Sequence, residues 1–342
     1  MINLRYHIVS IVAVFLALGM GIVMGSTVID RVTVDALNNK LDSVRNSTNA
    51  IRDDNTRLKN QVRQGQDFAD TTRDELLRGH LKGVPVMVVA VAGIDRAPVD
   101  DLRAALVTAQ ATVEGTVWFT SKMRLANDND VRALAEALQL SLDRPDVVRS
   151  GALARILVPR DSSSPEPSPL ASLSAGGFIT YDPPPAPATT STSTASPPPT
   201  LASLPLAGTR YVVVSGAGAE VSDDLVAVPF VRTASQPTVS QPGPSQPGSN
   251  PSSSTSTSTP TATSGRVVAA EAGQDTQGGR AVFVGLLRGD AVLSTRVSTV
   301  DNLESAMGQT ATILALEDLS VPRFGHYGVG PGAQRILPAP PA

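Results

Sequence analysis

Few residues in this 342-residue chain are of types that do chemistry, and they lie far apart. The three histidines are His7, His80 and His326, and there is no cysteine. The lack of thiols removes thiolate nucleophiles and thiolate metal sites. Neither the zinc-protease pattern HExxH nor the hydrolase pattern GxSxG occurs, and no catalytic residue stands out. The sequence therefore predicts that the protein is not an enzyme.

A glycine-containing segment, Val214-Ser-Gly-Ala-Gly218, partly fits the GxGxxG pattern of nucleotide-binding loops. Val221 takes the place of the third glycine, however, and no clear helix begins there. A plain turn is the favoured interpretation, and no cofactor-binding residue is predicted. The acidic pairs Asp100-Asp101, Asp223-Asp224 and Glu317-Asp318 fit solvated helix ends or loops better than cation sites.

Thioether and imidazole groups are the soft metal ligands that remain, and copper(I) is an ion that prefers them. Met20 and Met24 lie four residues apart, so they share one face of a helix and an oligomer could gather them into a ring. The competing interpretations are ordinary apolar methionines and, where His326 precedes Tyr327, a hydrogen-bonded turn. The metal site is unassigned, and its candidates are Met20, Met24, His80 and His326.

The elements that must position these residues begin with an uncharged run from Ile8 to Ile29. As a helix its 22 residues (8 to 29 inclusive) would reach about 33 Å, enough to cross a hydrocarbon core of about 30 Å. A cleaved signal peptide is the alternative, but its apolar core would be shorter, and Gly25-Ser26-Thr27 is a poor cleavage site. We predict an uncleaved signal anchor.

The charges beside this run suggest its orientation. Arg5 precedes the run, and Asp30, Arg31 and Asp35 follow it without a basic excess. The positive-inside tendency places the N-terminus in the cytoplasm. We therefore expect a single-pass protein of the cell membrane with an extracytoplasmic C-terminal domain.

Two patterns indicate self-association. Ala13, Ala17, Gly21 and Gly25 form a stripe of small residues where a second membrane helix could pack. Residues 30–80 contain no proline and fit a seven-residue coiled-coil repeat. The seam of this repeat consists of residues Val34, Leu37, Leu41, Val44, Ile51, Asn55, Leu58 and Val62.

The predicted coiled coil would form a stalk about 75 Å long. Asn55 is the kind of polar seam residue that fixes register, and the seam weakens beyond Val62. In a parallel pair Asp54 would face Lys59 favourably, whereas Lys40 would face Arg45 unfavourably. The alternatives are a single charged helix and pairing with an acidic partner helix.

From Gly83 onward, apolar strands alternate with helices, which predicts an α/β fold with an open, mainly parallel sheet. Strands are expected near residues 84–91, 115–120, 178–181, 211–215, 266–269 and 281–285. Helices are expected from about Pro98, over 128–140 and over 298–316.

Two tracts rich in proline, serine and threonine interrupt this domain, and they are expected to be disordered because they hold little apolar surface. The predicted divisions are 1–29 (cytoplasmic N-terminus and anchor), 30–80 (stalk), 81–160, 206–233 and 265–337 (α/β domain), 161–205 (mostly low-complexity insertion with a short strand), 234–264 (disordered insertion) and 338–342 (tail).

Three stretches of the chain are similar to the actinobacterial copper transporter MctB family: MINLRYHIVSIVAVFLALGMGIVMGS, IRDDNTRLKNQV, and STVDNLESAMGQTATILAL with GHYGVG. The resemblance covers residues 1 to about 135 and about 265 to 337. It implies an envelope protein of copper homeostasis, described as a pore for copper efflux. It also implies relatives in cell separation that hold a partner through an anchor and a coiled coil.

Two functions follow as expectations. The first is copper homeostasis or transport, in which copper is a transported or sensed ion rather than a cofactor. The second is an envelope or septation scaffold that holds a protein partner through its stalk. A membrane β-barrel does not fit, because aromatic residues are only 4% and the predicted span is helical. The net charge of −3 gives no reason to expect nucleic acid.

Overall fold

The computed structural model describes residues 4–160, 168–185, 200–236, 266–273, 282–321 and 323–339, without the side chains of 26–34. The chain divides into two compact units, Met1–Asp67 and Phe68–Ala342. Residues 161–167 and 186–199 of the first predicted insertion, and 237–264 of the second, lie outside the described residues.

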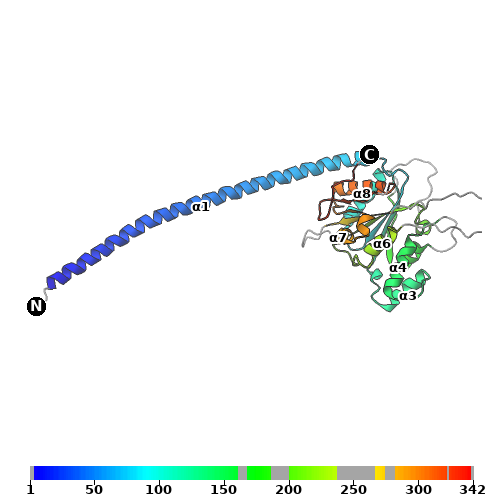
Figure 1. The fold of residues 1–342 in the computed structure, drawn as a ribbon, viewed down its shortest axis with the longest axis horizontal. Helices are drawn as coiled ribbons and strands as arrows, with labels where there is room; N and C mark the ends of the chain where they lie inside the picture. The colour runs from blue at the N-terminus through cyan, green and yellow to red at the C-terminus, as the bar shows by residue number, and fades with distance from the viewer. Residues whose placement is uncertain are drawn as a thin grey trace, which may run out of the picture. The chain divides into compact units, whose positions relative to one another are not determined.

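The first unit consists of one helix. Helix α1 (Leu4–Leu77) runs without interruption through the predicted anchor and stalk, and its residues from Phe68 onward belong to the second unit. Figure 1 shows it in blue to cyan. Among the described residues it holds the single segment long and apolar enough to cross a membrane, Leu4–Gly25, with a mean hydropathy of 2.6. The predicted span, residues 8–29, overlaps most of this segment.

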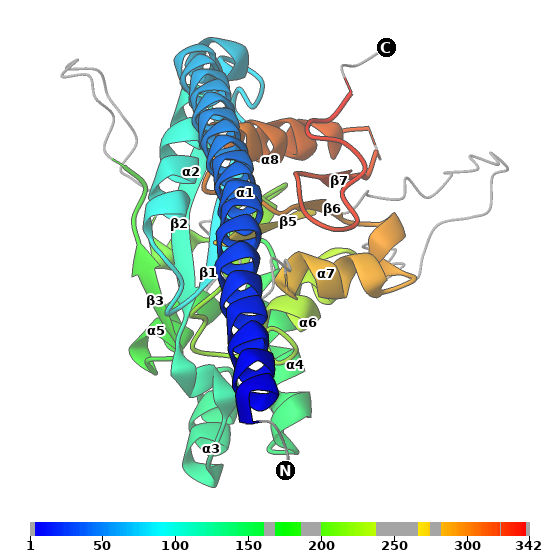
Figure 2. The same cartoon turned by 90° about the vertical axis from the view of Figure 1, so that its left-hand side faces the viewer.

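The second unit is built on one sheet. Within the described residues seven strands pair in the order β3-β2-β1-β4-β5-β6-β7 (Figure 2). All neighbours are parallel except β3, which lies antiparallel to β2 at one edge. The strands are β1 (Pro85–Val91), β2 (Thr112–Phe119), β3 (Ile179–Asp182), β4 (Arg210–Gly216), β5 (Val267–Ala272), β6 (Ser298–Val300) and β7 (His326–Tyr327).

Helices cover both faces of the sheet. The described helices of this unit are α2 (Ala97–Thr108), α3 (Asp128–Ala137), α4 (Pro145–Ile156), α5 (Pro169–Ala175), α6 (Ala227–Ala234), α7 (Val282–Gly289) and α8 (Ala306–Asp318), with short 3-10 turns at Ser121–Arg124, Leu201–Ser203 and Leu293–Thr295. Helices α3 to α7 pack on one face, and α2, α8 and the end of α1 pack on the other.

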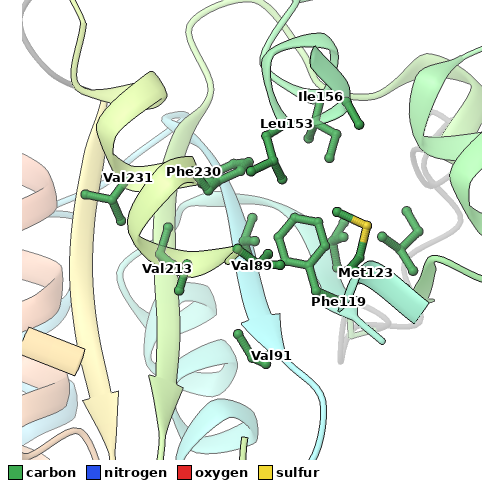
Figure 3. Packing of buried hydrophobic residues seen from close by; sticks show 14 of the residues in the cluster. Val89, Val91, Phe119, Met123, Leu153, Ile156, Val213, Phe230 and Val231 are labelled. Carbon is green, nitrogen blue, oxygen red and sulfur yellow. The ribbon is translucent and has the colours of Figure 1, made fainter. Parts of the chain in front are cut away.

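The central strands explain why two cores form. Successive strand residues point to opposite faces, so Val89 joins the core under α3 to α7 while Val88 joins the other. Figure 3 shows the first core, where Phe119 and Phe230 meet beside Val89. Their rings make an edge contact, with centroids 6.0 Å apart. The predicted α/β class with a mainly parallel sheet is confirmed.

Two predicted elements were wrong. Residues 281–285, expected to be a strand, open helix α7 from Val282 onward. The helix expected over 298–316 is instead strand β6 followed by α8, which begins at Ala306. The Ser305 side chain accepts a hydrogen bond from the backbone N–H of Gly308 and caps α8, which sets its start.

Candidate functional site

The membrane segment carries the two methionines proposed as soft ligands. Met20 and Met24 are 66% and 72% exposed on α1. A Cβ built on Gly21 or Gly25 would meet nothing within 4 Å, so this face of the unit is open. The small-residue stripe and the methionine pair remain predictions.

His80 lies where α1 docks onto the α/β domain. Its Nδ1 is 2.7 Å from Glu317 Oε2 on α8. Nearby, Arg73 Nη1 donates to Gln309 Oε1 at 2.7 Å. Leu77 is fully buried in the same core as α8. These contacts join the end of the long helix to α8, and they give His80 a structural partner.

A cavity of about 270 Å³ opens beside this junction. Leu76, Leu314 and Leu337 supply much of its apolar wall, while His80 and Glu317 lie at its polar side. The cavity is therefore lined by the last turn of α1, by α8 and by the C-terminal segment.

His326 was the other imidazole candidate, and the structure places it inside the domain. Its Nδ1 lies 3.0 Å from Thr299 Oγ1, and the ring also hydrogen-bonds the backbone of Ser294. Burial, together with the Arg288 guanidinium, lowers the pKa of His326 and favours the neutral imidazole. Its ring is thus held by hydrogen bonds within the domain.

Asp301 connects two of the sequence motifs, STVDN and GHYGVG. Its carboxylate is fully buried and pairs with Arg288 at 2.8 Å. It also accepts the backbone N–H groups of Val329 at 2.8 Å and Gly330 at 3.0 Å. A Cβ at Gly328, whose φ is +125°, would overlap this carboxylate. Gly328 and Gly330 of the second motif therefore leave the space that the aspartate of the first occupies.

A second cavity, of about 340 Å³, lies at the carboxyl ends of β4 and β5. The loop from Gly216 to Ala219 forms one wall, and Asp223 and Glu271 line the other side with Val282. Asp223 accepts a hydrogen bond from Ser215 Oγ at 2.5 Å. Asp223 lies in a loop, as expected, but it is half-buried at this cavity.

Glu271 lies in β5 and is only 1% exposed, and its carboxylate contacts the start of α7. It accepts the backbone N–H groups of Val282 at 2.7 Å and Val284 at 3.0 Å. Burial raises the pKa of Glu271 to about 7, and repulsion from Asp223 adds to this, while the N–H groups oppose it. Burial also raises the pKa of Asp223. The sequence signal that was missed is a lone carboxylate inside the apolar strand VVAAEA.

The described side chains do not form a conventional metal centre. No group of three or more His, Cys, Asp or Glu residues comes together in the part of the chain that the structure describes.

The loops that follow β1 and β4 touch each other, since a Cβ on Gly93 would overlap the carbonyl of Gly218. That contact fills the gap between these two loops.

Comparison with known proteins defines the family. A family model described as "Copper transport outer membrane protein, MctB" matches residues 1–338. The chain belongs to the MctB family. The match also includes the middle of the chain, between about residues 135 and 265, which the sequence resemblance does not cover.

Curated relatives have similar lengths. Copper transporter MctB of Mycobacterium tuberculosis is 25% identical over 354 residues, covering 98% of this chain and 99% of the relative. Copper transporter MctB of Mycobacterium leprae is 27% identical over 353 residues with the same coverage. The family is described by copper transport and by a membrane, not by an enzymatic activity.

Proposed function

We propose that this protein acts in copper transport or copper homeostasis at a membrane. The observation that carries the proposal is the family match over residues 1–338, together with relatives named as copper transporters over nearly their whole length. The apolar segment Leu4–Gly25 supplies the membrane attachment. Copper is the cargo or the sensed ion in this proposal.

A strain that lacks the gene tests this function. We expect the deletion strain to hold more copper per cell and to grow less well in added copper, and the wild-type gene should restore both. Zinc and nickel serve as controls, because a general envelope defect would change tolerance to several stresses. Unaltered copper content and copper tolerance would contradict the proposal.

Direct copper handling by the methionine pair is a separate question. Replacing Met20 and Met24 with leucine conserves volume and apolarity, so folding should change little. The matched control replaces Ile11 and Ile22 of the same segment with leucine. We expect copper tolerance to survive the methionine double substitution, because no described cluster of further ligands supports the pair. Loss of tolerance at normal protein level would assign the two thioethers to the copper path.

The exposed stripe on α1 favours a second candidate function, an envelope scaffold. In the described part of the stalk Leu37, Leu41, Val44, Ile51, Leu58 and Val62 are each between 45% and 61% exposed. An apolar stripe of this kind is suited to a partner helix. Chained or branched cells with broad sensitivity to envelope stress in the deletion strain would support this role. Normal septa with a copper-specific defect would count against it.

A further inference from the structure

We propose that α1 pairs with a second, parallel copy of itself over residues 37–62, and that this pairing stops at Gly65 because the α/β domain packs beside the same helix face from Ala69 onward. The proposal deepens the stalk-pairing role above by naming the partner, its direction and the point where the interface ends.

The distribution of apolar residues defines the paired segment. Between residues 35 and 66, every leucine, isoleucine and valine occupies an inner position (a or d) of the seven-residue repeat. All of them are exposed on α1. A helix with one narrow apolar stripe at this spacing buries it best against a second helix of the same pattern. The partner must therefore offer a matching stripe.

A second copy offers such a stripe, and the membrane sets its direction. Two copies anchored through Leu4–Gly25 in one bilayer leave it from the same end, so their stalks run parallel. Asn55 then faces its own counterpart in the seam, which fixes register. Asp54 faces Lys59 of the partner helix across the parallel pair. The unfavourable approach of Lys40 to Arg45 is reduced, because Asp42 already lies 3.5 Å from Arg45 on the same helix.

At the C-terminal end of α1, the α/β domain lies beside this helix face. The inner positions Ala69 and Thr72 are half-buried, unlike those before Gly65. Arg73, the neighbour of Thr72, donates to Gln309 of α8, which is itself buried. The next inner residue, Leu76, is 57% exposed but lines one cavity together with Thr310 and Leu314 of α8. Helix α8 therefore lies beside the side on which a partner helix would continue.

The composition of the last inner positions agrees with this change of partner. Gly65, Ala69 and Thr72 are small, whereas the preceding inner residues Leu58 and Val62 are larger and apolar. A Cβ on Gly65 would meet nothing within 4 Å, so Gly65 makes no side-chain contact and separates the two interfaces along the helix. The apolar seam therefore weakens beyond Val62 at the point where the helix stops packing against a second copy and begins to pack against the domain.

Disulfide formation in the full-length protein in membranes tests the proposal. Because the chain has no cysteine, each introduced thiol is the only one. The test variants are Val44→Cys, Ile51→Cys and Leu58→Cys at inner positions, Thr72→Cys beyond the proposed end, and Asn46→Cys and Asn60→Cys on the outer face as controls. Diamide serves as the oxidant, and dimers are resolved by mass on non-reducing gels.

We expect on the order of tenfold more covalent homodimer at the three inner positions than at Asn46 or Asn60, because a disulfide needs Cα atoms within about 7 Å. Thr72→Cys should behave like the outer controls. Strong dimer formation at Thr72 would overturn the proposed end. Three results would overturn pairing with a second copy: equal amounts of covalent dimer at all positions, no dimer at the inner positions, or a cross-linked product that contains a different protein.

Two further measurements check the folding of each variant and, independently, the proposed role in copper transport or homeostasis. Trp118, the single tryptophan, is 3% exposed within the domain, so unchanged fluorescence shows that each variant is folded. Copper content of the deletion strain does not depend on where the stalk pairs. A normal cross-linking pattern in a strain without a copper defect would therefore refute the copper proposal and leave the pairing intact.

Discussion

Asp301 is a fully buried carboxylate whose partners come from separate parts of the chain. Arg288 on α7 gives it a counter-charge, and the backbone after β7 gives it two N–H donors. Arg288 also donates to the carbonyl of Tyr327 at 3.0 Å. Because both charged side chains are removed from water, removing one of them leaves the other without compensation.

Asp301→Asn should therefore destabilise the domain by about 3 kcal/mol, since it leaves the Arg288 guanidinium buried and unpaired. Urea unfolding of the full chain in detergent, followed by Trp118 fluorescence, measures the change. Asp146→Asn is the control, because its pair with Arg144 is exposed on both sides and should contribute less than about 1 kcal/mol. Equal effects of the two substitutions would show that the buried pair has no special importance.

Glu271 makes the stability depend on pH. Its folded-state pKa is raised from an ordinary 4.5 to about 7 by burial and by Asp223. The folded protein thus holds a proton that the unfolded chain has already lost, and stability falls as pH rises through this window. The contribution is fully present below pH 4.5 and is lost above about pH 7.

Asp223→Asn should reduce this fall, because it removes the neighbouring negative charge while an amide oxygen can still accept from Ser215. The measurement is the difference in urea midpoint between pH 5.5 and pH 8, compared with the wild type. Asp224→Asn is the control, since Asp224 is exposed. A pH difference as large in Asp223→Asn as in the wild type would contradict coupling of the two carboxylates.

Helix α1 belongs to two environments, and neighbouring leucines near its end show the boundary. Leu77 is fully buried against the domain, while Leu76 is 57% exposed. Leu77→Ala should cost about 3 kcal/mol of domain stability through lost burial and a residual cavity. Leu76→Ala should cost less than about 1 kcal/mol. Comparable losses, measured by the same Trp118 unfolding assay, would show that the helix end is not part of the domain core.

The elements that sequence patterns predicted best are the apolar strands at the centre of the sheet. Strands β1, β4 and β5 are buried on both faces, so their continuous apolar runs are distinctive. Residues 281–285 are also apolar, but Phe283 and Leu287 lie four apart on the buried side of a helix. A short apolar run does not separate these two cases.

The cavity carboxylates were harder to predict than the strands. Glu271 is single and has no neighbouring motif, and its pairing with Asp223 depends on the packing of β4 beside β5. The candidate imidazoles could be found by residue type alone. Their roles required the fold, because His80 and His326 obtain partners that are 237 and 27 residues away in sequence.

At the scale of the whole molecule, we propose that the α/β domain is extracytoplasmic. Its basis is Arg5 on the N-terminal side of the apolar segment. A reporter that is active only after export, fused after Ala342, should be active. The matched control carries the same reporter on a chain without residues 1–33, which should be inactive. Activity only from a reporter that works in the cytoplasm would reverse the topology.

The order of the strands determines how the domain bears tension on its anchor. The chain passes from α1 directly into β1, which lies between β2 and β4 and is parallel to both. A pull through α1 first loads the Leu77 packing and the Arg73 and His80 contacts on α8. The next element to receive the load is β1. Because β1 is hydrogen-bonded to a strand on each side, the strand that receives the force is among the most strongly held in the sheet.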